Sequence, residues 1–166
     1  MFWFRKSNFN QRAALARLFC FCAIVPVTME TIICYTSGVS RGNPGPGAVG
    51  VYITDEAGAM LCEEAQAIGN CTTDFAEYQA VLLGLQTLQS LLGEKSRKTA
   101  VELRLASELV KKQLNAESTI TDPGLVPLFI EIHNTRVESF PHLTLHLITS
   151  EENSQAGQLV NEALVI

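Results

Sequence analysis

Two acidic side chains, Asp74 and Glu77, lie three residues apart at the start of an apolar repeat. Carboxylate oxygens are the ligands that Mg²⁺ prefers in proteins, so this pair is a candidate for a weak single-metal site. The same spacing is typical of a capping box, in which the second acid bonds back to the backbone N–H of the helix cap residue. We favour the capping interpretation and keep the metal site as the alternative.

Other side chains that could do chemistry have simpler explanations. Ser37 lies in no nucleophile-elbow pattern, so we do not expect it to act as a nucleophile. The adjacent acids Glu151 and Glu152 are expected to face water, with a role as substitute metal ligands as the alternative. His142 and His146 lie on one face of an alternating segment, which favours a sheet surface over a catalytic base.

The composition predicts one globular domain in a reducing compartment. A chain of 166 residues with 47% hydrophobic content is long enough for one core and hardly for two. The five cysteines are an odd number without a C-x-x-C pair, which indicates neither a disulfide framework nor a zinc site. We therefore predict a cytoplasmic protein.

The charge is distributed unevenly between the first 28 residues and the rest. Residues 1–28 contain four of the 12 Lys and Arg residues and no acid. Residues 29–166 therefore hold eight basic groups against all 17 acidic ones, a net charge of −9. Proteins that bind nucleic acid strongly usually carry a basic surface that neutralises phosphates. A strong, sequence-independent binder of nucleic acid is therefore excluded.

The first 28 residues also differ from the rest in pattern. The apolar run from Leu18 to Val27 is too short to span a bilayer as a relaxed helix, so no stable membrane span is expected. We interpret residues 1–28 as an N-terminal extension or misplaced start, with a targeting segment and a membrane-surface anchor as alternatives. The domain is then predicted to comprise residues 29–166.

From residue 30 onward the sequence predicts an α/β domain. Alternating and apolar runs indicate strands over residues 31–37, 48–55 and 59–69, with turns over 40–47 and 55–58. Strands joined by such short connections favour an antiparallel meander. Apolar residues then recur at intervals of three and four, which indicates a helix that starts near Thr72 and is closed by Gly93.

The second half continues with alternating strands and helices. Residues 100–106 and 142–148 alternate as strands, and Ser107 is placed to cap a short helix. Two further helices are expected from Pro123 and from Ser154. The predicted order is βββαβααβα, a five-stranded mixed sheet flanked by helices.

Four segments of the chain carry a family resemblance. They are YTSGVSRGNPGPG, TTDFAEYQAVLLGL, LASELVKKQLN and EENSQAGQLVNEAL. Their order and spacing resemble those of ribonuclease H type I, over about residues 31–164. The chain resembles the short bacterial and archaeal form, because nothing between Asn115 and Pro123 could form the basic protrusion of some members.

The resemblance implies the ribonuclease H fold and a metal-dependent endonuclease that cuts the RNA strand of RNA–DNA hybrids. The family uses four carboxylates around two divalent ions, which activate a water and stabilise the leaving oxygen. Glu77 matches one of these acids, whereas Ser37, Ala106 and Gly157 stand where the family has aspartates. The charge of the site therefore falls from about −4 to about −1, and two Mg²⁺ ions lose their ligands.

We therefore predict a pseudoenzyme that has lost its magnesium site. No cofactor is expected, and Mg²⁺ or Mn²⁺ would be needed only for residual activity, with Glu77 at most as a ligand. The resemblance implies contacts to nucleic acid through turn backbone amides and polar side chains near the first strand and the first helix. In this chain the corresponding candidates are Arg41, Asn43, Thr73, Asp74, Lys111 and Lys112. Because Thr73 and Asp74 replace paired asparagines of the family, we expect weak, salt-sensitive binding.

The sequence is compatible with three functional hypotheses. The first is a catalytically silent domain kept as a module that binds RNA–DNA hybrid or structured RNA weakly, or that binds an unknown protein partner. The alternative is a functional ribonuclease H that cleaves hybrids through residual or substitute metal ligands. The third is a folded remnant without a role of its own.

Overall fold

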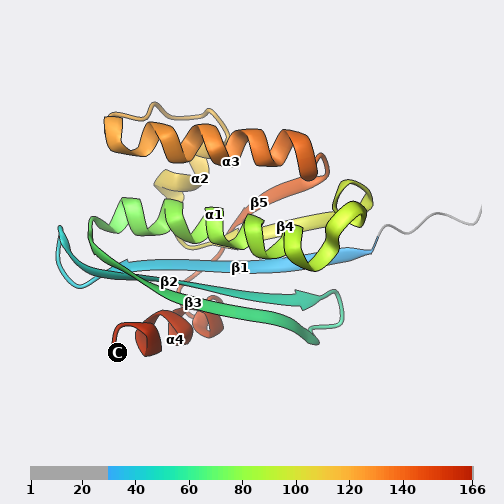
Figure 1. Cartoon of the computed structure of the whole chain (residues 1–166), viewed down its shortest axis with the longest axis horizontal. Coiled ribbons are helices and arrows are strands. Elements are labelled where there is room, and N and C mark those ends of the chain that lie inside the picture. Colours follow the sequence, from blue (N-terminus) through green and yellow to red (C-terminus); the bar gives the residue numbers. More distant parts are fainter. Residues whose placement is uncertain (1–29, 166) are drawn as a thin grey trace, which may run out of the picture.

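The computed structural model of the chain describes residues 30–165 (Figure 1). The predicted extension over residues 1–28 lies outside the described residues, so its interpretations stay predictions. Three long strands follow one another as an antiparallel meander. They are β1 (Thr31–Ser40), β2 (Gly45–Asp55) and β3 (Met60–Cys71).

Two more strands complete a five-stranded sheet. β4 (Ala100–Leu105) pairs parallel to β1, and β5 (Leu143–Leu147) pairs parallel to β4. The strand order is β3-β2-β1-β4-β5. Parallel neighbours need a crossover connection, which explains why long helical segments precede β4 and β5. The predicted fold class, a mixed sheet that starts with a meander, is confirmed.

The longest helix, α1 (Thr73–Leu92), covers one face of the sheet. It begins where the Thr72 hydroxyl accepts a hydrogen bond of 3.2 Å from the backbone N–H of Phe75, and it ends at Gly93, which has a φ of 53°. Its apolar side chains, among them Tyr78 and Leu85, are fully buried against the sheet. These contacts form the main core of the domain.

Shorter helices extend the layer above α1. They are η1 (Gly93–Lys98), α2 (Glu108–Leu114), η2 (Pro123–Leu125) and α3 (Val126–Ser139). Ser107 caps α2 as predicted, because its hydroxyl accepts from the Val110 N–H at 3.3 Å. The buried Tyr78 hydroxyl donates to Gln113 at 2.9 Å and ties α1 to α2. Of the helices in residues 30–165, none is both long and apolar enough for a bilayer crossing.

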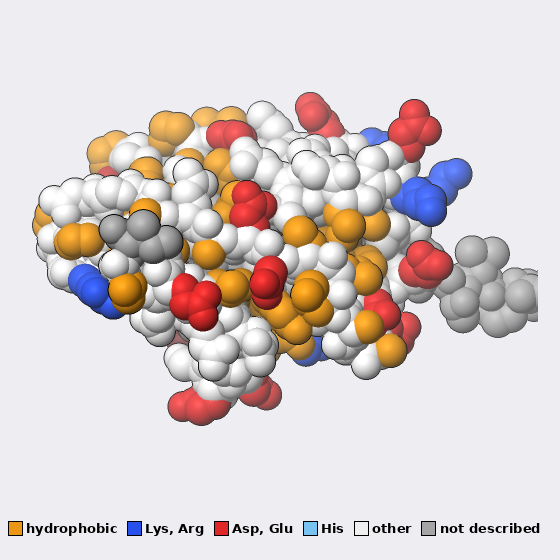
Figure 2. All heavy atoms as spheres, turned by 60° about the horizontal axis from the view of Figure 1, so that its bottom comes forward, with side chains coloured by type: hydrophobic (Ala, Val, Ile, Leu, Met, Phe, Trp, Pro, Cys, Tyr) orange, Lys and Arg blue, Asp and Glu red, His pale blue; other side chains and the backbone are white. Residues whose placement is uncertain are grey.

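The last helix, α4 (Ser154–Ala163), packs on the opposite face of the sheet (Figure 1). It rests on β2 and is held through Val160 and Ala163, which form a small second core with Ala48. Figure 2 shows the side of the molecule on which α4 lies. Acidic side chains are scattered across this side, and basic ones lie mainly near its edges. The acidic excess of the sequence is thus visible on the surface next to α4.

The strands are longer than the sequence predicts at one end of the sheet. β1 continues to Ser40, and β2 starts at Gly45, so most of the predicted turn belongs to the sheet. The Ser40 hydroxyl bonds to the carbonyl oxygens of Gly45, at 3.0 Å, and of Cys71, at 2.7 Å. These bonds join the ends of all three meander strands, and local sequence patterns do not reveal them.

Gly50 of β2 and Gly157 of α4 provide a matched test of this packing. A Cβ at Gly50 would lie 2.6 Å from the carbonyl oxygen of Ala156, whereas a Cβ at Gly157 would meet nothing within 4 Å. Gly50→Ala should therefore lower the free energy of unfolding by about 1 to 3 kcal/mol, because α4 must shift. Gly157→Ala should raise it by about 1 kcal/mol through helix propensity. Urea unfolding of both variants measures the two effects, and an unchanged Gly50→Ala variant would contradict this packing.

Candidate active site

The candidate site lies at the end of β1 that points toward the start of α1. Ser37 is 9% exposed and pairs with Gly50 of β2. On its other side, the parallel register pairs Tyr35 with Arg104. Two residues further along both strands, the same register places Ala106 beside Ser37, directly after β4. Two positions that the resemblance assigns to family acids are thus neighbours.

Gly38 brings α1 close to β1. A Cβ at Gly38 would lie 2.2 Å from the carbonyl carbon of Ala76 and 2.4 Å from the nitrogen of Glu77. No residue larger than glycine permits this approach without a backbone shift. The approach places the third family position, Glu77, against the residue that follows Ser37.

The fourth position arrives from α4 on the other face of the sheet. Gly50 lies opposite Ser37, and the Ala156 carbonyl oxygen packs where a Cβ of Gly50 would lie. Just before α4, the side-chain amide of Asn153 donates a hydrogen bond of 2.9 Å to the carbonyl oxygen of Thr36 in β1. Gly157, the residue after Ala156, is therefore held near Ser37. Four elements thus converge on one place, as the resemblance implies.

Glu77 is the one carboxylate among these four positions. Burial raises its pKa to about 7, a hydrogen bond from the Gly38 backbone opposes this rise, and the charge of Asp74 adds to it. One carboxylate oxygen, Oε2, is buried without a hydrogen-bond partner among the described residues, as is Oδ1 of Asn153. A buried polar atom without a hydrogen-bond partner lowers the stability of the folded state. The site nevertheless keeps two such oxygens, which no contact among the described residues satisfies.

The donors at this site do not fit two divalent ions. Ser37 provides a neutral hydroxyl, and Ala106 and Gly157 provide no side-chain ligand. Mg²⁺ requires oxygen ligands, and two neighbouring dications need several carboxylates to offset their repulsion. Within residues 30–165, no group of three or more His, Cys, Asp or Glu side chains is arranged to hold a metal ion. No catalytic step through metal ions follows from this donor set.

The predicted capping box between Asp74 and Glu77 is wrong. The cap of α1 is Thr72, so the third helical residue, where a capping glutamate would stand, is Phe75. Glu77 lies two residues further on and contacts Gly38 of β1 instead. The spacing from Asp74 to Glu77 misled the interpretation because it did not identify which residue begins the helix.

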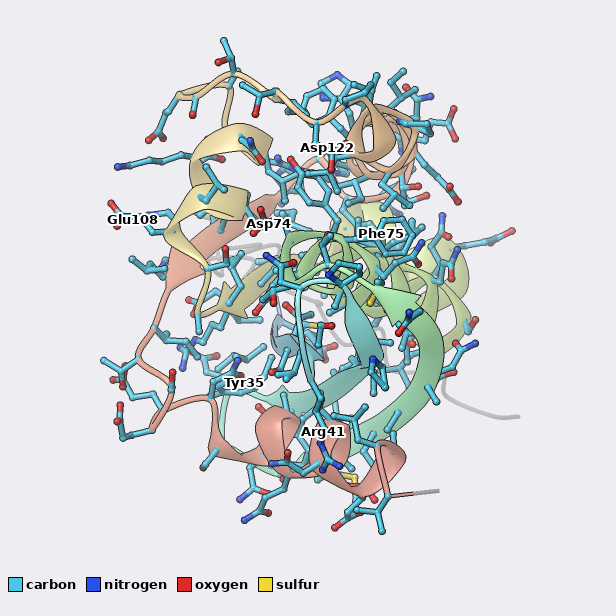
Figure 3. All side chains as sticks on the ribbon, turned by 90° about the vertical axis from the view of Figure 1, so that its left-hand side faces the viewer. Tyr35, Arg41, Asp74, Phe75, Glu108 and Asp122 are labelled. Atoms are coloured by element: carbon cyan, nitrogen blue, oxygen red, sulfur yellow. The ribbon has the colours of Figure 1, made fainter. Side chains whose placement is uncertain are left out.

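Some of the predicted nucleic-acid contacts lie together around the start of α1. The side-chain oxygen of Asn43 accepts a hydrogen bond of 3.4 Å from the Thr73 N–H, which joins the β1–β2 turn to α1. Asp74 is exposed beside this contact. Arg41 is also exposed, and Figure 3 shows it nearer to α4 than to Asp74. The turn is thus fixed to the helix, with Arg41 on its outer side.

The two lysines of α2 lie apart from this turn. Lys112 pairs with Glu108 at 2.7 Å, and Figure 3 shows Glu108 at the outer edge of α2, away from Arg41. Lys111 is half-buried. The structure therefore does not bring the predicted basic contacts into one cluster.

The remaining candidates have structural surroundings. Glu151 is exposed, and the Glu152 carboxylate accepts from the Thr149 N–H at 2.9 Å, so it stabilises the loop before α4. His142 and His146 are exposed. His146 is hydrogen-bonded to the hydroxyl of Thr144 on the same sheet face, at 3.0 Å. Neither histidine lies among the four converging positions.

Three residues that hold the site together were not singled out from the sequence. They are Gly38, Gly50 and Asn153. Glycine inside a strand often marks a place where another backbone approaches closely, so the two glycines carried a usable signal. Asn153 carried none, because its partner, the Thr36 carbonyl, is 117 residues away.

The raised pKa of Glu77 predicts a pH dependence of stability. The folded chain keeps a proton on Glu77 up to about pH 7, whereas the unfolded chain releases it near the ordinary value of 4.5. Between these values the folded state binds more protons, so its stability falls as the pH rises. The loss is on the order of 3 kcal/mol.

The variant Glu77→Gln has no ionisable group at this position, so its stability should not fall between pH 4.5 and about pH 7 as that of the parent does. From about pH 5 to about pH 8, its free energy of unfolding should rise steadily relative to that of the parent. Asp74→Asn is the control, since it removes only a neighbouring charge and should reduce the effect without abolishing it. A constant difference between parent and Glu77→Gln across this range would mean that Glu77 is not held in a desolvated place.

Comparisons with known proteins agree with this architecture. A family model described as "Reverse transcriptase-like" matches residues 35–163. Among curated proteins, ribonuclease HI of Halobacterium salinarum is 32% identical over 130 residues, which are 78% of this chain and 62% of that protein. A bifunctional protein of Mycobacterium tuberculosis is 28% identical over 134 residues, 80% of this chain and 35% of its own length. The chain thus spans less than two thirds of these curated relatives.

Solved structures of two RNase H1 proteins match over nearly their whole length. LC11-RNase H1, isolated from compost by a metagenomic approach, is 41% identical with a TM-score of 0.78, over 82% of this chain and 97% of its own. A second structure of LC11-RNase H1 contains an RNA/DNA hybrid. RNase H1 of Halobacterium salinarum is 32% identical with a TM-score of 0.74, over 81% of this chain and 98% of its own. With its sheet order, its four converging positions and these similarities, the chain belongs to the type I ribonuclease H family.

Proposed function

We propose that this chain is a catalytically silent ribonuclease H domain that binds RNA–DNA hybrid weakly. The observation that carries this proposal is a contrast within one site. Contacts at Gly38, Gly50 and Asn153 still hold the four positions together, yet three of them offer no carboxylate. Without these carboxylates, the charge that two divalent ions require is missing.

The retained geometry supports a kept module over a decayed enzyme. Decay without selection would affect packing glycines and capping residues as readily as acids. Here the close approach at Gly38 and the Ser107 cap of α2 persist. The space beside Gly157 is also open, so the absence of an acid there has no steric cause.

The hybrid is the ligand class that we propose because LC11-RNase H1, 41% identical, has been solved with an RNA/DNA hybrid. In this chain Arg41, Asn43 and Thr73 would contact the backbone of the nucleic acid near the start of α1. The binding is weak and salt-sensitive, because residues 29–166 carry a net charge of −9 and Lys112 is already paired with Glu108. Structured RNA offers the same phosphate chemistry, and a protein partner is the remaining possibility for a silent module.

A second candidate function is residual cleavage through substitute ligands. The unpartnered Oε2 of Glu77 favours it, since this oxygen remains available to a cation. Such a site would need Mg²⁺ or Mn²⁺ and further oxygen ligands, for example from Asp74. Glu77→Gln would abolish this activity.

We also propose a cytoplasmic location and a boundary near residue 29. The three cysteines of the described region, Cys34, Cys62 and Cys71, are free thiols, which suits a reducing compartment. Residues 1–28 would then be an extension that contributes nothing to the site, and residues 29–166 the ribonuclease H domain.

A cleavage assay tests the proposal. The full chain is incubated with a labelled RNA–DNA hybrid and Mg²⁺ or Mn²⁺, beside the triple variant Ser37→Asp, Ala106→Asp, Gly157→Asp. The parent should leave the hybrid intact, because it lacks the ligands for two ions. The triple variant should cut with a rate at least about 100-fold above the parent, because the missing charge is restored on an intact scaffold.

Two controls make the assay decisive. The triple variant with Glu77→Gln added should lose its activity, which separates specific cleavage from a contaminating nuclease. Cutting by the parent that Glu77→Gln stops would contradict the proposal and establish residual activity. Failure of the triple variant to cut, with its fold intact by circular dichroism, would mean that the four positions no longer share the geometry of an active site.

A further inference from the structure

We propose that this site accepts the phosphate backbone of an RNA–DNA hybrid without any divalent cation. The inference rests on the proposed function and adds how the same site is regulated: by the ionic strength of the solution and not by Mg²⁺. It starts from the mismatch between the donor set and the two ions of the family, which leaves the convergence of the four positions in place.

The four converging positions carry little negative charge. Four clustered carboxylates repel a phosphate, so a nucleic acid can approach them only when cations offset the repulsion. In this chain three of the four positions are neutral, and the fourth, Glu77, is recessed between α1 and Gly38 of β1. The exposed acids Asp74, Glu108, Glu151 and Glu152 all lie outside the four converging positions. The repulsion that cations would have to offset is therefore largely removed.

Two of the four positions also have small residues. The side chain of Ala106 is a single methyl group, and no atom lies within 4 Å of the place where a Cβ of Gly157 would lie. The space beside Gly157 is therefore open, and Ala106 does not extend beyond its methyl group, so neither residue fills the volume that an aspartate side chain would take. Ser37, between them, offers a hydroxyl that both donates and accepts hydrogen bonds, so it suits a phosphate oxygen better than a carboxylate would.

The β1–β2 turn, which lies next to the start of α1, provides a positively charged side chain. The β1–β2 turn is fixed to α1 by the bond from the Thr73 N–H to Asn43. Arg41 projects from this turn and is exposed. It belongs to neither ion pair of the described region, which are Arg104–Glu102 and Lys112–Glu108. A phosphate backbone that passes the four positions thus meets one free guanidinium beside a rigid turn. Contacts of this kind need no metal ion.

Fluorescence anisotropy tests the inference on the full chain. A labelled RNA–DNA hybrid is titrated in a chelator and in Mg²⁺ at matched ionic strength, because Mg²⁺ also weakens phosphate contacts by general screening. The parent should bind with the same dissociation constant in both solutions, within about twofold. The triple variant Ser37→Asp, Ala106→Asp, Gly157→Asp should bind about tenfold or more weakly in chelator and recover in Mg²⁺.

A charge-matched variant separates local from general repulsion. Ala57→Asp, Ser90→Asp and Asn134→Asp add three acids at exposed positions away from the site. Ser90 follows Glu77 by 13 residues in α1, a distance of about 20 Å. This variant should lose the same modest factor in both solutions, because its added charges are too distant to bind ions at the site. A loss specific to chelator in this variant would overturn the inference.

The outcomes distinguish the two proposals. A parent that binds the hybrid only in Mg²⁺ overturns the cation-free contact and leaves the proposed weak binding and the absence of cleavage untouched. A parent that binds the hybrid in neither solution overturns both the cation-free contact and the proposed hybrid binding. Cutting of the hybrid by the parent, checked on a denaturing gel of the same samples, overturns the proposed function. If the triple variant does not fold, the dissociation constants of the parent in chelator and in Mg²⁺ still show whether its binding requires the cation.

Discussion

The close approach of two helices to the central strands is the constraint on which the site depends. α1 can reach β1 only because Gly38 has no side chain, and α4 can lie on β2 only because Gly50 has none. These contacts fix a helix on each face of the sheet at the same height, since Ser37, next to Gly38, pairs with Gly50. Backbone packing therefore determines where the four residues lie, and hydrogen bonds of their own side chains do not.

This separation of scaffold from chemistry explains how the acids can be absent without disturbing the fold. Clustered carboxylates in a partly buried place repel one another, and each disfavours the ionisation of the next. Replacing three of them removes this repulsion and costs no packing contact at Gly157, whose surroundings are open. The remaining acid still experiences burial, which raises the pKa of Glu77 to about 7. Under the proposed function, the loss of cleavage and a gain of stability act in the same direction, a relation that is common at active sites.

The sequence predicted those features that depend on local signals. Thr72 near the start of α1, Gly93 at its end and Ser107 before α2 were recognisable because caps and positive φ values favour a few residue types. The order of strands and helices followed from periodicity. The family resemblance, in turn, predicted which four positions form the candidate site.

Features that depend on distant contacts could not be predicted in the same way. The ends of the meander strands depend on Ser40, whose hydroxyl bonds to residues of two other strands. The surroundings of Glu77 depend on Gly38, 39 positions earlier in the chain, so a local capping pattern gave the wrong interpretation. Asn153 reaches back across most of the domain to Thr36. In each case the decisive partner is brought close by the fold and not by the sequence.

Thermal unfolding in a chelator and in Mg²⁺ tests most directly whether the metal centre is lost. A cation that binds the folded state raises the unfolding temperature, and one that finds no ligands does not. The parent should unfold at the same temperature in both solutions, within about 1 °C. The variant with aspartates at positions 37, 106 and 157 should be less stable in chelator and regain several degrees (about 4 °C or more) in Mg²⁺. A parent that Mg²⁺ stabilises as strongly as this variant would show that the site still holds its ions.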